Sequence, residues 1–266
     1  MPILGRQNGP PDPLSWSRPV AWFDAFAFER RRNERVKRSV SRSALARVHR
    51  SPFREGRTML SLRQLLVRHS PVLLVDAASV QVQVGWITRD GTTRWATSNE
   101  EAGVGVFRCL EQLSAQPDEA AAFVFCDGPG SILGVRTVAT AVRTWSVLSP
   151  RPAFAYHSLS VVAAALNEPA ALVIADARRD SWHGLSLGGK LRRIPTAELA
   201  GPLVTPDGFR NWTPLPAGVR HMPYILADLL PRTADIGLFR ETDAPDAFLH
   251  EEPSYVTWTP QVHRAP

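Results

Sequence analysis

The sequence predicts a two-lobed α/β fold. Three observations support this prediction: an antiparallel meander that starts near residue 71, a strand, turn and helix over residues 121–149, and a second strand-and-hairpin pattern that starts at residue 171. Apolar residues make up 44% of the 266 residues, which is ample for packed cores. The order of the helices and strands along the chain indicates one architecture within this fold class.

Positive charge is concentrated at the start of the chain. Residues 1–58 hold 13 Lys and Arg against 5 Asp and Glu, whereas the rest of the chain carries a balance of −2. We expect a basic, disordered extension that either holds RNA phosphates by charge or is a solvated or untranslated segment before Met59. An N-terminal lobe is then expected over residues 59–158 and a degenerate C-terminal lobe over residues 159–266.

Cysteine usage and hydropathy indicate a cytoplasmic protein without membrane association. The two cysteines, Cys109 and Cys126, lie within apolar patterns, so neither a disulfide framework nor a zinc knuckle is indicated. No run approaches the roughly 18 to 20 uncharged apolar residues that a membrane helix needs, and the first residues lack an apolar signal core.

A three-stranded meander opens the folded part. Residues 72–76 are a short apolar run, and valines alternate with polar residues from Val80 to Trp86. Asp90-Gly91 suits a type I′ turn, whose two central positions both need positive φ, and residues 92–97 supply the returning strand.

A helix, a strand and a second helix follow the meander. We expect Asn99 to cap the first helix, with two glutamates in its first turn and an apolar stripe of Val106, Phe107, Leu110 and Leu113. After a strand over residues 121–126, the second helix is expected over residues 131–149, with one apolar face formed by Ile132, Val135, Val138, Val142 and Trp145.

The remaining pattern repeats this order in a shorter form. We expect strands at 153–156 and 171–176, separated by a helix at 158–166 that Ser158 caps. A hairpin of 181–187 with 190–194 should follow. The Pro/Gly-rich residues 201–223 are expected to lack regular structure, and a short helix is expected near 224–230. Meander, helix, strand, helix, strand is the order of a ribonuclease H-like sheet, and two such lobes form an actin/Hsp70-like (ASKHA) architecture. A Rossmann fold fits less well because its sheet would not open with a tight hairpin.

The glycine turn Gly128-Pro129-Gly130-Ser131-Ile132-Leu133-Gly134-Val135-Arg136 joins the strand to the second helix. Its glycines permit close approach of an anion to a helix N-terminus, which makes Gly128, Gly130, Ser131, Gly134 and Arg136 a candidate nucleotide or anion site. The alternative is that the segment only turns the chain and caps the helix through Ser131. No Lys-Ser/Thr follows the turn, so it is not a Walker motif.

Three aspartates, Asp76, Asp127 and Asp176, each end an apolar run. At the carboxyl edge of a sheet they would suit Mg²⁺ with a phosphate or a two-metal nuclease centre. Asp is also a common turn residue whose carboxylate accepts backbone N–H groups, and that alternative stays open. No histidine pair with zinc spacing occurs, so no metal ion is assigned.

With these motifs placed, the chain resembles the TsaB (YeaZ) family, whose members carry a Gcp-like domain. Asp76-Ala77-Ala78-Ser79 is similar to the family's Asp-Thr-Ser motif, and the glycine turn is similar to its GPGSFTGVR segment. Residues 175–178 resemble the IDAR segment, and residues 252–255 resemble the Pro-x-Tyr motif. Ala77, Ile132-Leu133 and Thr257 depart from the family pattern.

The resemblance implies a noncatalytic scaffold in the synthase complex for tRNA N6-threonylcarbamoyladenosine (t6A) at position 37. The implied partners are a TsaD-like catalytic subunit and a TsaE-like ATPase, with tRNA reached indirectly and a homodimer possible when the chain is alone. The family pairs through two helices, here about residues 99–115 and 131–149, so the implied interface candidates are Phe107, Leu110, Val142 and Trp145. No cofactor of its own is expected, although ATP or ADP with Mg²⁺ at the complex interface stays open. The alternative function is a Mg²⁺-dependent ASKHA phosphotransferase or RNase H-like hydrolase that uses the three aspartates.

Overall fold

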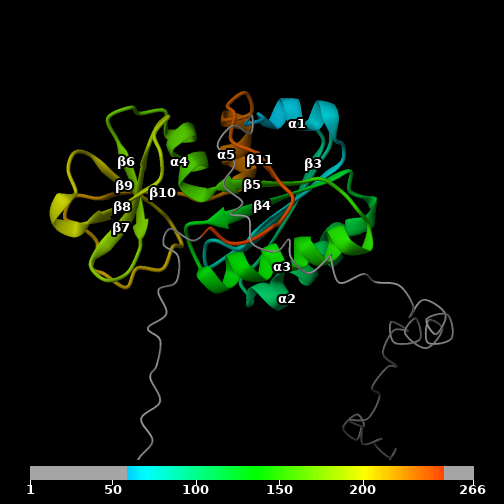
Figure 1. Ribbon diagram of the computed structural model, residues 1–266, viewed down its shortest axis with the longest axis horizontal. Helices are drawn as coiled ribbons and strands as arrows, with labels where there is room; N and C mark the ends of the chain where they lie inside the picture. Colours follow the sequence, from blue (N-terminus) through cyan, green and yellow to red (C-terminus); the bar gives the residue numbers. More distant parts are fainter. Residues whose placement is uncertain (1–58, 249–266) are drawn as a thin grey trace, which may run out of the picture. The chain divides into compact units, whose positions relative to one another are not determined.

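The structure, a computed structural model, describes residues 59–248 (Figure 1). All of them belong to one compact unit. The basic extension expected over residues 1–58 and the Pro-x-Tyr segment lie outside the described residues. The described part contains two sheets, of six and five strands, and five α-helices.

The first sheet has the strand order β11-β5-β4-β1-β2-β3. Its strands are β1 (Val72–Asp76), β2 (Val82–Ile87), β3 (Thr93–Ser98), β4 (Ala122–Gly128), β5 (Ala153–His157) and β11 (Arg240–Thr242). The expected meander is confirmed, because β1 pairs antiparallel with β2 and β2 pairs antiparallel with β3, with Leu74 opposite Gly85. On its other side β1 pairs parallel with β4, and β4 pairs parallel with β5.

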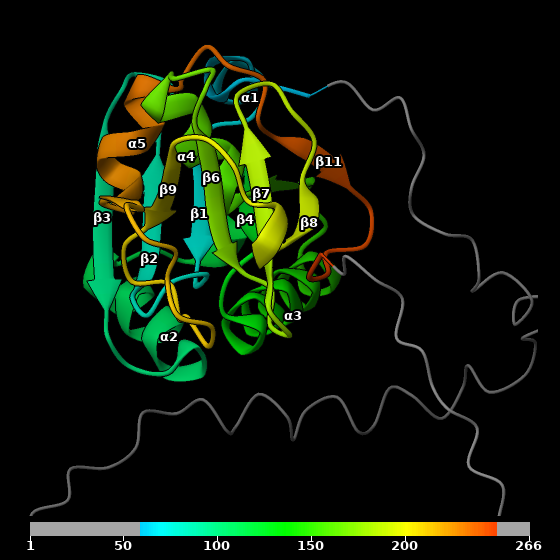
Figure 2. The same ribbon diagram turned by 90° about the vertical axis from the view of Figure 1, so that its left-hand side faces the viewer.

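The second sheet repeats this arrangement with the order β10-β9-β6-β7-β8. Figure 2 labels four of these strands, β9, β6, β7 and β8. Its strands are β6 (Leu172–Asp176), β7 (Ser181–Ser186), β8 (Arg192–Pro195), β9 (Leu203–Pro206) and β10 (Arg220–Met222). The antiparallel pairs β6–β7 and β7–β8 and the parallel pairs β6–β9 and β9–β10 match those of β1 to β5 one for one. This repetition confirms the two-lobed, actin/Hsp70-like prediction. The second copy is reduced, since only a 3-10 turn (η4, Thr196–Glu198) separates β8 from β9.

Helices cover both faces of the first sheet. They are α1 (Leu62–Arg68), α2 (Ala102–Leu113), α3 (Ile132–Leu148), α4 (Ser158–Leu166) and α5 (Leu226–Arg232), with a further 3-10 turn, η3 (Pro117–Glu119). The helices α2 and α3 lie side by side and share one apolar cluster with the strands above them (Figure 1). The helices α4 and α5 pack together in a second cluster, which includes residues of both sheets. Among residues 59–248, no helix is both long and apolar enough to cross a bilayer.

The start of α2 corrects one expectation. Its first residue is Ala102 and its N-cap is Glu101, which makes no side-chain capping bond, so Asn99 is not the cap and neither glutamate enters the first turn. The Ser98 hydroxyl accepts the Glu100 N–H (3.1 Å) and holds the chain outside the helix. The buried stripe of α2 contains Val106, Leu110 and Leu113, but Phe107 is 54% exposed because it lies about 100° round the helix from Val106.

Two strands lie within residues 201–223, where we expected no regular structure. The strand β9 is buried along its whole length and pairs parallel with both β6 and β10. Its prolines do not break it because Pro202 precedes the strand and Pro206 ends it. This expectation was wrong because it was based on the local proline and glycine content, whereas β9 and β10 are formed by pairing between strands that are distant in the sequence.

Other segments also differ from the expectations. The helix α1 was not expected, although Ser61 and Gln64 form a capping box in which each side chain accepts the other residue's backbone N–H. The strand β11 lies within the C-terminal lobe expected over residues 159–266, yet it joins the first sheet beside β5. Ser158 is the first residue of α4 rather than its cap, and its hydroxyl donates to the Pro129 carbonyl (2.5 Å).

Candidate functional site

The glycine turn packs directly against the turn that follows β1. The Ser131 N–H donates to the Ala78 carbonyl (2.7 Å), and a Cβ on Gly130 would lie 2.4 Å from the same oxygen. A Cβ on Gly134 would lie 2.1 Å from the Ala77 carbonyl oxygen. These glycines are therefore needed for close approach of the two family-like motifs. Ser131 caps α3 as expected, since its hydroxyl accepts the Gly134 N–H (3.3 Å).

Asp76 is sealed inside the protein. One carboxylate oxygen accepts the Ala78 N–H (2.8 Å), and the other accepts the hydroxyls of Tyr156 (2.6 Å) and Tyr224 (2.8 Å). Burial raises the pKa of this carboxyl, and the hydrogen bonds from Tyr156, Ala78 and Tyr224 act in the opposite direction. Because Tyr224 follows β10 of the second sheet, Asp76 joins the two lobes.

Gln83 on β2 makes a second connection between the lobes. It is 1% exposed, and its side-chain amide donates to the Tyr224 carbonyl (2.8 Å) while its side-chain oxygen accepts the Leu226 N–H (2.9 Å). Both backbone groups at the start of α5 are thereby satisfied away from water. Loss of this amide would leave two buried polar groups without partners.

Asp127 binds the segment that follows the second lobe and contains β11. It is 3% exposed, with one oxygen 2.7 Å from the His157 Nδ1 and the other accepting from Arg240 (2.7 Å). The backbone carbonyl of Asp127 accepts the Phe248 N–H (2.7 Å), and the Phe248 ring lies edge-on to the His157 ring at 5.1 Å between centroids. The carboxylate is thus part of an ion-paired clasp around β11.

Asp176 anchors the loop that joins β9 and β10. One oxygen accepts the Arg178 N–H (2.5 Å), and the other accepts the N–H groups of both Trp212 and Thr213 (2.6 Å each). This is the Asp-turn chemistry that the sequence left open as the alternative to metal binding. Within residues 59–248, no three His, Cys, Asp or Glu side chains are grouped so that they could hold a metal ion.

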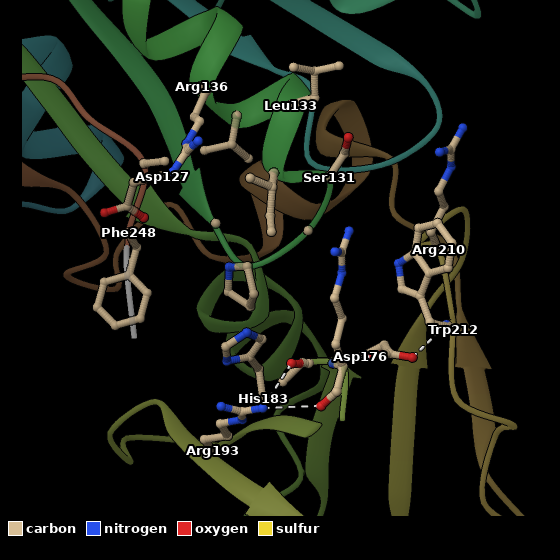
Figure 3. A pocket seen from close by; sticks show the side chains of 18 residues that line it. Asp127, Ser131, Leu133, Arg136, Asp176, His183, Arg193, Arg210, Trp212 and Phe248 are labelled. Carbon is tan, nitrogen blue, oxygen red and sulfur yellow. Dashed lines mark hydrogen bonds between the residues drawn. The ribbon is translucent and has the colours of Figure 1, made fainter. Parts of the chain in front are cut away.

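A pocket of about 480 Å³ lies beside the glycine turn (Figure 3). Figure 3 shows Ser131, Leu133 and Arg136 at the start of α3, Asp176, His183 and Arg193 from the second sheet, and Arg210 with Trp212 from the loop after β9. The lining includes two aspartates, Asp127 and Asp176, and four arginines, Arg136, Arg178, Arg193 and Arg210. Four arginines against two aspartates leave the lining of the pocket with a net positive charge.

Two of the pocket arginines have guanidinium groups without a partner among residues 59–248. Within the described part of the chain, the guanidinium groups of Arg136 and Arg210 make neither a hydrogen bond nor an ion pair, and both residues are exposed. The Arg178 guanidinium lies 5.0 Å from the ring centroid of Trp212, whose side chain is nevertheless among the exposed apolar groups at 64%. Arg136, named from the sequence, therefore lines the pocket together with Arg210 and Trp212, which the sequence did not single out.

The interface candidates separate into two classes. Leu110 (6% exposed) and Val142 (0%) are buried in the core between the helices and the first sheet, which corrects their assignment to a partner surface. Trp145 is half-buried, with its ring centroid 5.8 Å from that of Phe123. Of the four candidates, only Phe107 is exposed.

The outer face of α2 and α3 carries other apolar side chains. The exposed large apolar residues of the two helices are Val104, Phe107, Ile132, Leu133, Val147 and Leu148, of which Ile132 lines the pocket described above. Between Leu133 and Val147, the hydroxyls of Thr137, Thr140 and Thr144 each donate to the carbonyl four residues earlier. Their hydrogen-bonding needs are therefore met within the helix. We call this surface, from Val104 to Leu148 on the two helices, the α2–α3 face.

Several residues of the site were missed from the sequence. The alternating pattern places Gln83 on the polar, outward side of a strand, but both faces of β2 are buried. Tyr156 and Tyr224 lie 80 and 148 residues from Asp76, so no local spacing connects them to it. Arg210 and Trp212 lie in a Pro/Gly-rich segment. The composition of that segment predicts only a surface loop, so it does not mark these two residues as part of a pocket.

Comparison with known proteins supports the resemblance. The sequence model of TsaD, described as tRNA N6-adenosine threonylcarbamoyltransferase, matches residues 98–199, from the end of β3 to the end of η4. This segment contains the glycine turn and the Asp176 turn, so the resemblance to the Gcp-like TsaB/TsaD family is confirmed there. No curated protein sequence matches the chain.

Two solved structures are similar to this chain. YeaZ from Pseudomonas aeruginosa has 20% identity and a TM-score of 0.43, with 52% of this chain and 76% of that chain covered. An uncharacterized protein with similarity to peptidase YEAZ from Pseudomonas aeruginosa has 19% identity and a TM-score of 0.45, with 59% and 89% covered. The strand order and pairing of the two sheets define the fold independently of these two likenesses.

Proposed function

We propose that this chain is a noncatalytic subunit that supports the threonylcarbamoylation of N6 of adenosine 37 in tRNA. Its proposed role is to hold a TsaD-like catalytic subunit in an active conformation, with a TsaE-like ATPase as a further partner and tRNA bound indirectly. The match of residues 98–199 to the TsaD family relates the chain to t6A biosynthesis. The observation that carries the noncatalytic role is the state of the three strand-end aspartates.

Each strand-end carboxylate is committed to structural hydrogen bonds. Asp76 binds two tyrosines and a backbone N–H, Asp127 binds a histidine and an arginine, and Asp176 binds three backbone N–H groups. A Mg²⁺ site for phosphoryl transfer needs carboxylate oxygens free to coordinate the ion at about 2.0–2.1 Å. This arrangement favours the scaffold over the alternative of a Mg²⁺-dependent phosphotransferase or hydrolase.

The α2–α3 face is the proposed docking surface. On α3, Leu133, Thr137, Thr140, Thr144 and Val147 follow one another at spacings of four, three, four and three residues, which is the seam of a helix that packs against other helices. Phe107 and Val104 extend the apolar surface onto α2. A TsaD-like subunit that presents two helices would complete a four-helix bundle, and a second copy of this chain would take the same place in its absence.

Binding between the full chain and the TsaD-like subunit of the same organism tests the proposal. We expect Phe107→Asp and Leu133→Asp each to weaken the complex by about thirtyfold or more, because truncating or charging a central anchor costs about 2 kcal/mol or more. Val67→Asp is the matched control, since Val67 is 62% exposed on α1 and far in sequence from the face. Titration calorimetry on variants with native thermal midpoints gives the affinities. No complex between the folded wild-type proteins, or an equal loss in Val67→Asp, would contradict the docking role.

A further inference from the structure

We propose that residues 240–248 form a strap that opens and closes on the first lobe as one unit, and that docking of the TsaD-like subunit on the α2–α3 face holds it closed. The ion pair between Arg240 and Asp127 is the latch of this strap. The opening is a property of the chain alone, whereas the effect of docking rests on the function proposed above.

Both ends of the strap are fastened to one residue, Asp127. At the start of the strap, the Arg240 guanidinium donates to the Asp127 carboxylate (2.7 Å). At its end, the Phe248 N–H donates to the Asp127 backbone carbonyl (2.7 Å). Asp127 is a fixed anchor, because it is 3% exposed and lies on β4, an inner strand of the first sheet. The strap is thus a short loop closed on a single residue, and loss of the Arg240 contact leaves it tethered at one end only.

The middle of the strap is fastened to α3. The Arg143 guanidinium donates to the Pro245 carbonyl from Nε (3.2 Å) and from Nη2 (2.6 Å), and Nη2 lies 3.5 Å from the Asp246 carboxylate. The side chains of Arg143 and Asp246 are 54% and 70% exposed. Ion pairs with this exposure contribute little to stability, so this contact closes the strap only weakly in the free chain.

Burial of the strap residues contributes little to the closed state. Of these nine residues, Pro245 alone is buried, and β11 is a three-residue strand that pairs with β5 at the edge of the sheet. Segments with few buried contacts open at a lower free energy than the core does. The latch is better shielded from water, since the Asp127 side chain is 3% and the Arg240 side chain 35% exposed. We therefore expect the latch to set the free energy of opening.

Arg143 connects the strap to the docking surface. It lies three residues after Thr140 and four before Val147, so its side chain is next to both of them on α3. A partner that covers the α2–α3 face would therefore take Arg143 and its contacts with the strap out of water. Breaking a buried ion pair costs more than breaking one whose groups water can solvate. The free energy of opening should rise in the complex and, by reciprocity, a closed strap should favour docking.

Hydrogen–deuterium exchange of the full chain, followed by mass spectrometry, tests the opening. In the wild type, amides of the strap should exchange together and faster than those of β4. Arg240→Ala should speed the exchange of the strap by about tenfold or more and leave β4 unchanged, because one charge-assisted hydrogen bond is lost. Arg240→Lys keeps the charge and should recover most of the protection. Arg143→Ala leaves the latch intact and should speed the exchange only by about two- to fivefold.

Arg63→Ala is the matched control because Arg63 is an exposed arginine on α1 that pairs with Asp235, outside the strap. Its strap should exchange as in the wild type. Opening as a unit is overturned if the strap exchanges at the rate of β4 in the wild type, in Arg240→Lys and in Arg143→Ala alike. It is also overturned if Arg63→Ala speeds the exchange as much as Arg240→Ala does.

Addition of the TsaD-like subunit at a saturating concentration tests the coupling. The exchange of the strap should slow by about fivefold or more in the wild type, and this slowing should be lost in Arg143→Ala while the complex still forms. Unchanged exchange in a complex whose formation calorimetry demonstrates would overturn the coupling. Absence of any complex would contradict the docking role and the coupling together, whereas the exchange of the free chain still decides whether the strap opens.

Discussion

Replacing Tyr224 with Phe removes one hydroxyl from the connection between the two lobes. The ring of Tyr224 packs edge-on against Phe209 (5.0 Å between centroids), and phenylalanine preserves that contact. The change deletes only the hydrogen bond to the buried carboxylate of Asp76 (2.8 Å). The variant therefore measures how strongly this hydrogen bond couples the second lobe to the first.

The expected cost follows from the burial of the acceptor. Removing one partner of a buried hydrogen bond costs about 1–3 kcal/mol of the free energy of unfolding, so we expect Tyr224→Phe to lower it by about 2 kcal/mol. For a folded unit of this size, 1 kcal/mol shifts the melting temperature by about 2–4 °C, so the expected decrease is roughly 4–8 °C.

The pH dependence supplies a sharper test. Burial raises the pKa of Asp76 above its ordinary value of 3.8, so the folded protein holds the carboxyl proton more tightly than the unfolded chain does. The stability that this proton contributes is fully present below pH 3.8 and is lost as the pH rises through the folded pKa. The Tyr224 hydroxyl acts in the opposite direction because it stabilises the ionised carboxylate. The loss caused by Tyr224→Phe should therefore increase as the pH rises above the folded pKa of Asp76.

Urea unfolding over a series of pH values, followed by far-ultraviolet circular dichroism, gives the free energies. Asp76→Asn is the control background, because in it the effect of Tyr224→Phe should shrink and no longer depend on pH. Tyr156→Phe, which removes the hydrogen bond from within the first sheet, should show the same pH trend. A loss in Tyr224→Phe that is negligible, or is equal at all pH values and in both backgrounds, would refute this account of Asp76.

Two further predictions concern the core. Gly134→Ala should lower the free energy of unfolding by about 2–4 kcal/mol, because its Cβ would meet the Ala77 carbonyl at 2.1 Å, whereas Gly103→Ala on α2, with nothing within 4 Å, should raise it by about 0.5–1 kcal/mol. Equal effects of the two changes in scanning calorimetry would contradict the close approach of the turns. Burial raises the pKa of Cys109 to about 11 and that of Cys126 well above its ordinary value, so neither thiol should react with a maleimide at mildly alkaline pH until urea unfolds the protein. Rapid labelling of the native chain would show that the core opens readily.

The elements that could be predicted from the sequence are those that local patterns encode. The meander was predictable because strand alternation has a period of two and Asp90-Gly91 suits a tight hairpin turn. The order of strand, glycine turn and helix was predictable because Ser131 and the glycines mark the boundary between β4 and α3. The repetition of the strand order then gave the two lobes.

The features that the sequence could not reveal depend on contacts between residues that are far apart in the chain. The strands β9 and β10 have unremarkable compositions, and they form because β9 pairs with the edge of β6 and β10 pairs in turn with β9. The assignment of Leu110 and Phe107 to one stripe failed because the phase of α2 depends on which side of the helix the first sheet covers. The structural use of Asp76 was not predictable, since its tyrosine partners come from two other parts of the chain.

The central claim is that the chain supports t6A formation without carrying out the chemistry. The most direct test is the rate of t6A formation on tRNA by the TsaD-like and TsaE-like subunits of the same organism, measured with and without the full chain. We predict that modification depends on the chain and that the chain alone forms no t6A. An unchanged rate when the chain is omitted, or t6A formation by the chain alone, would contradict the account.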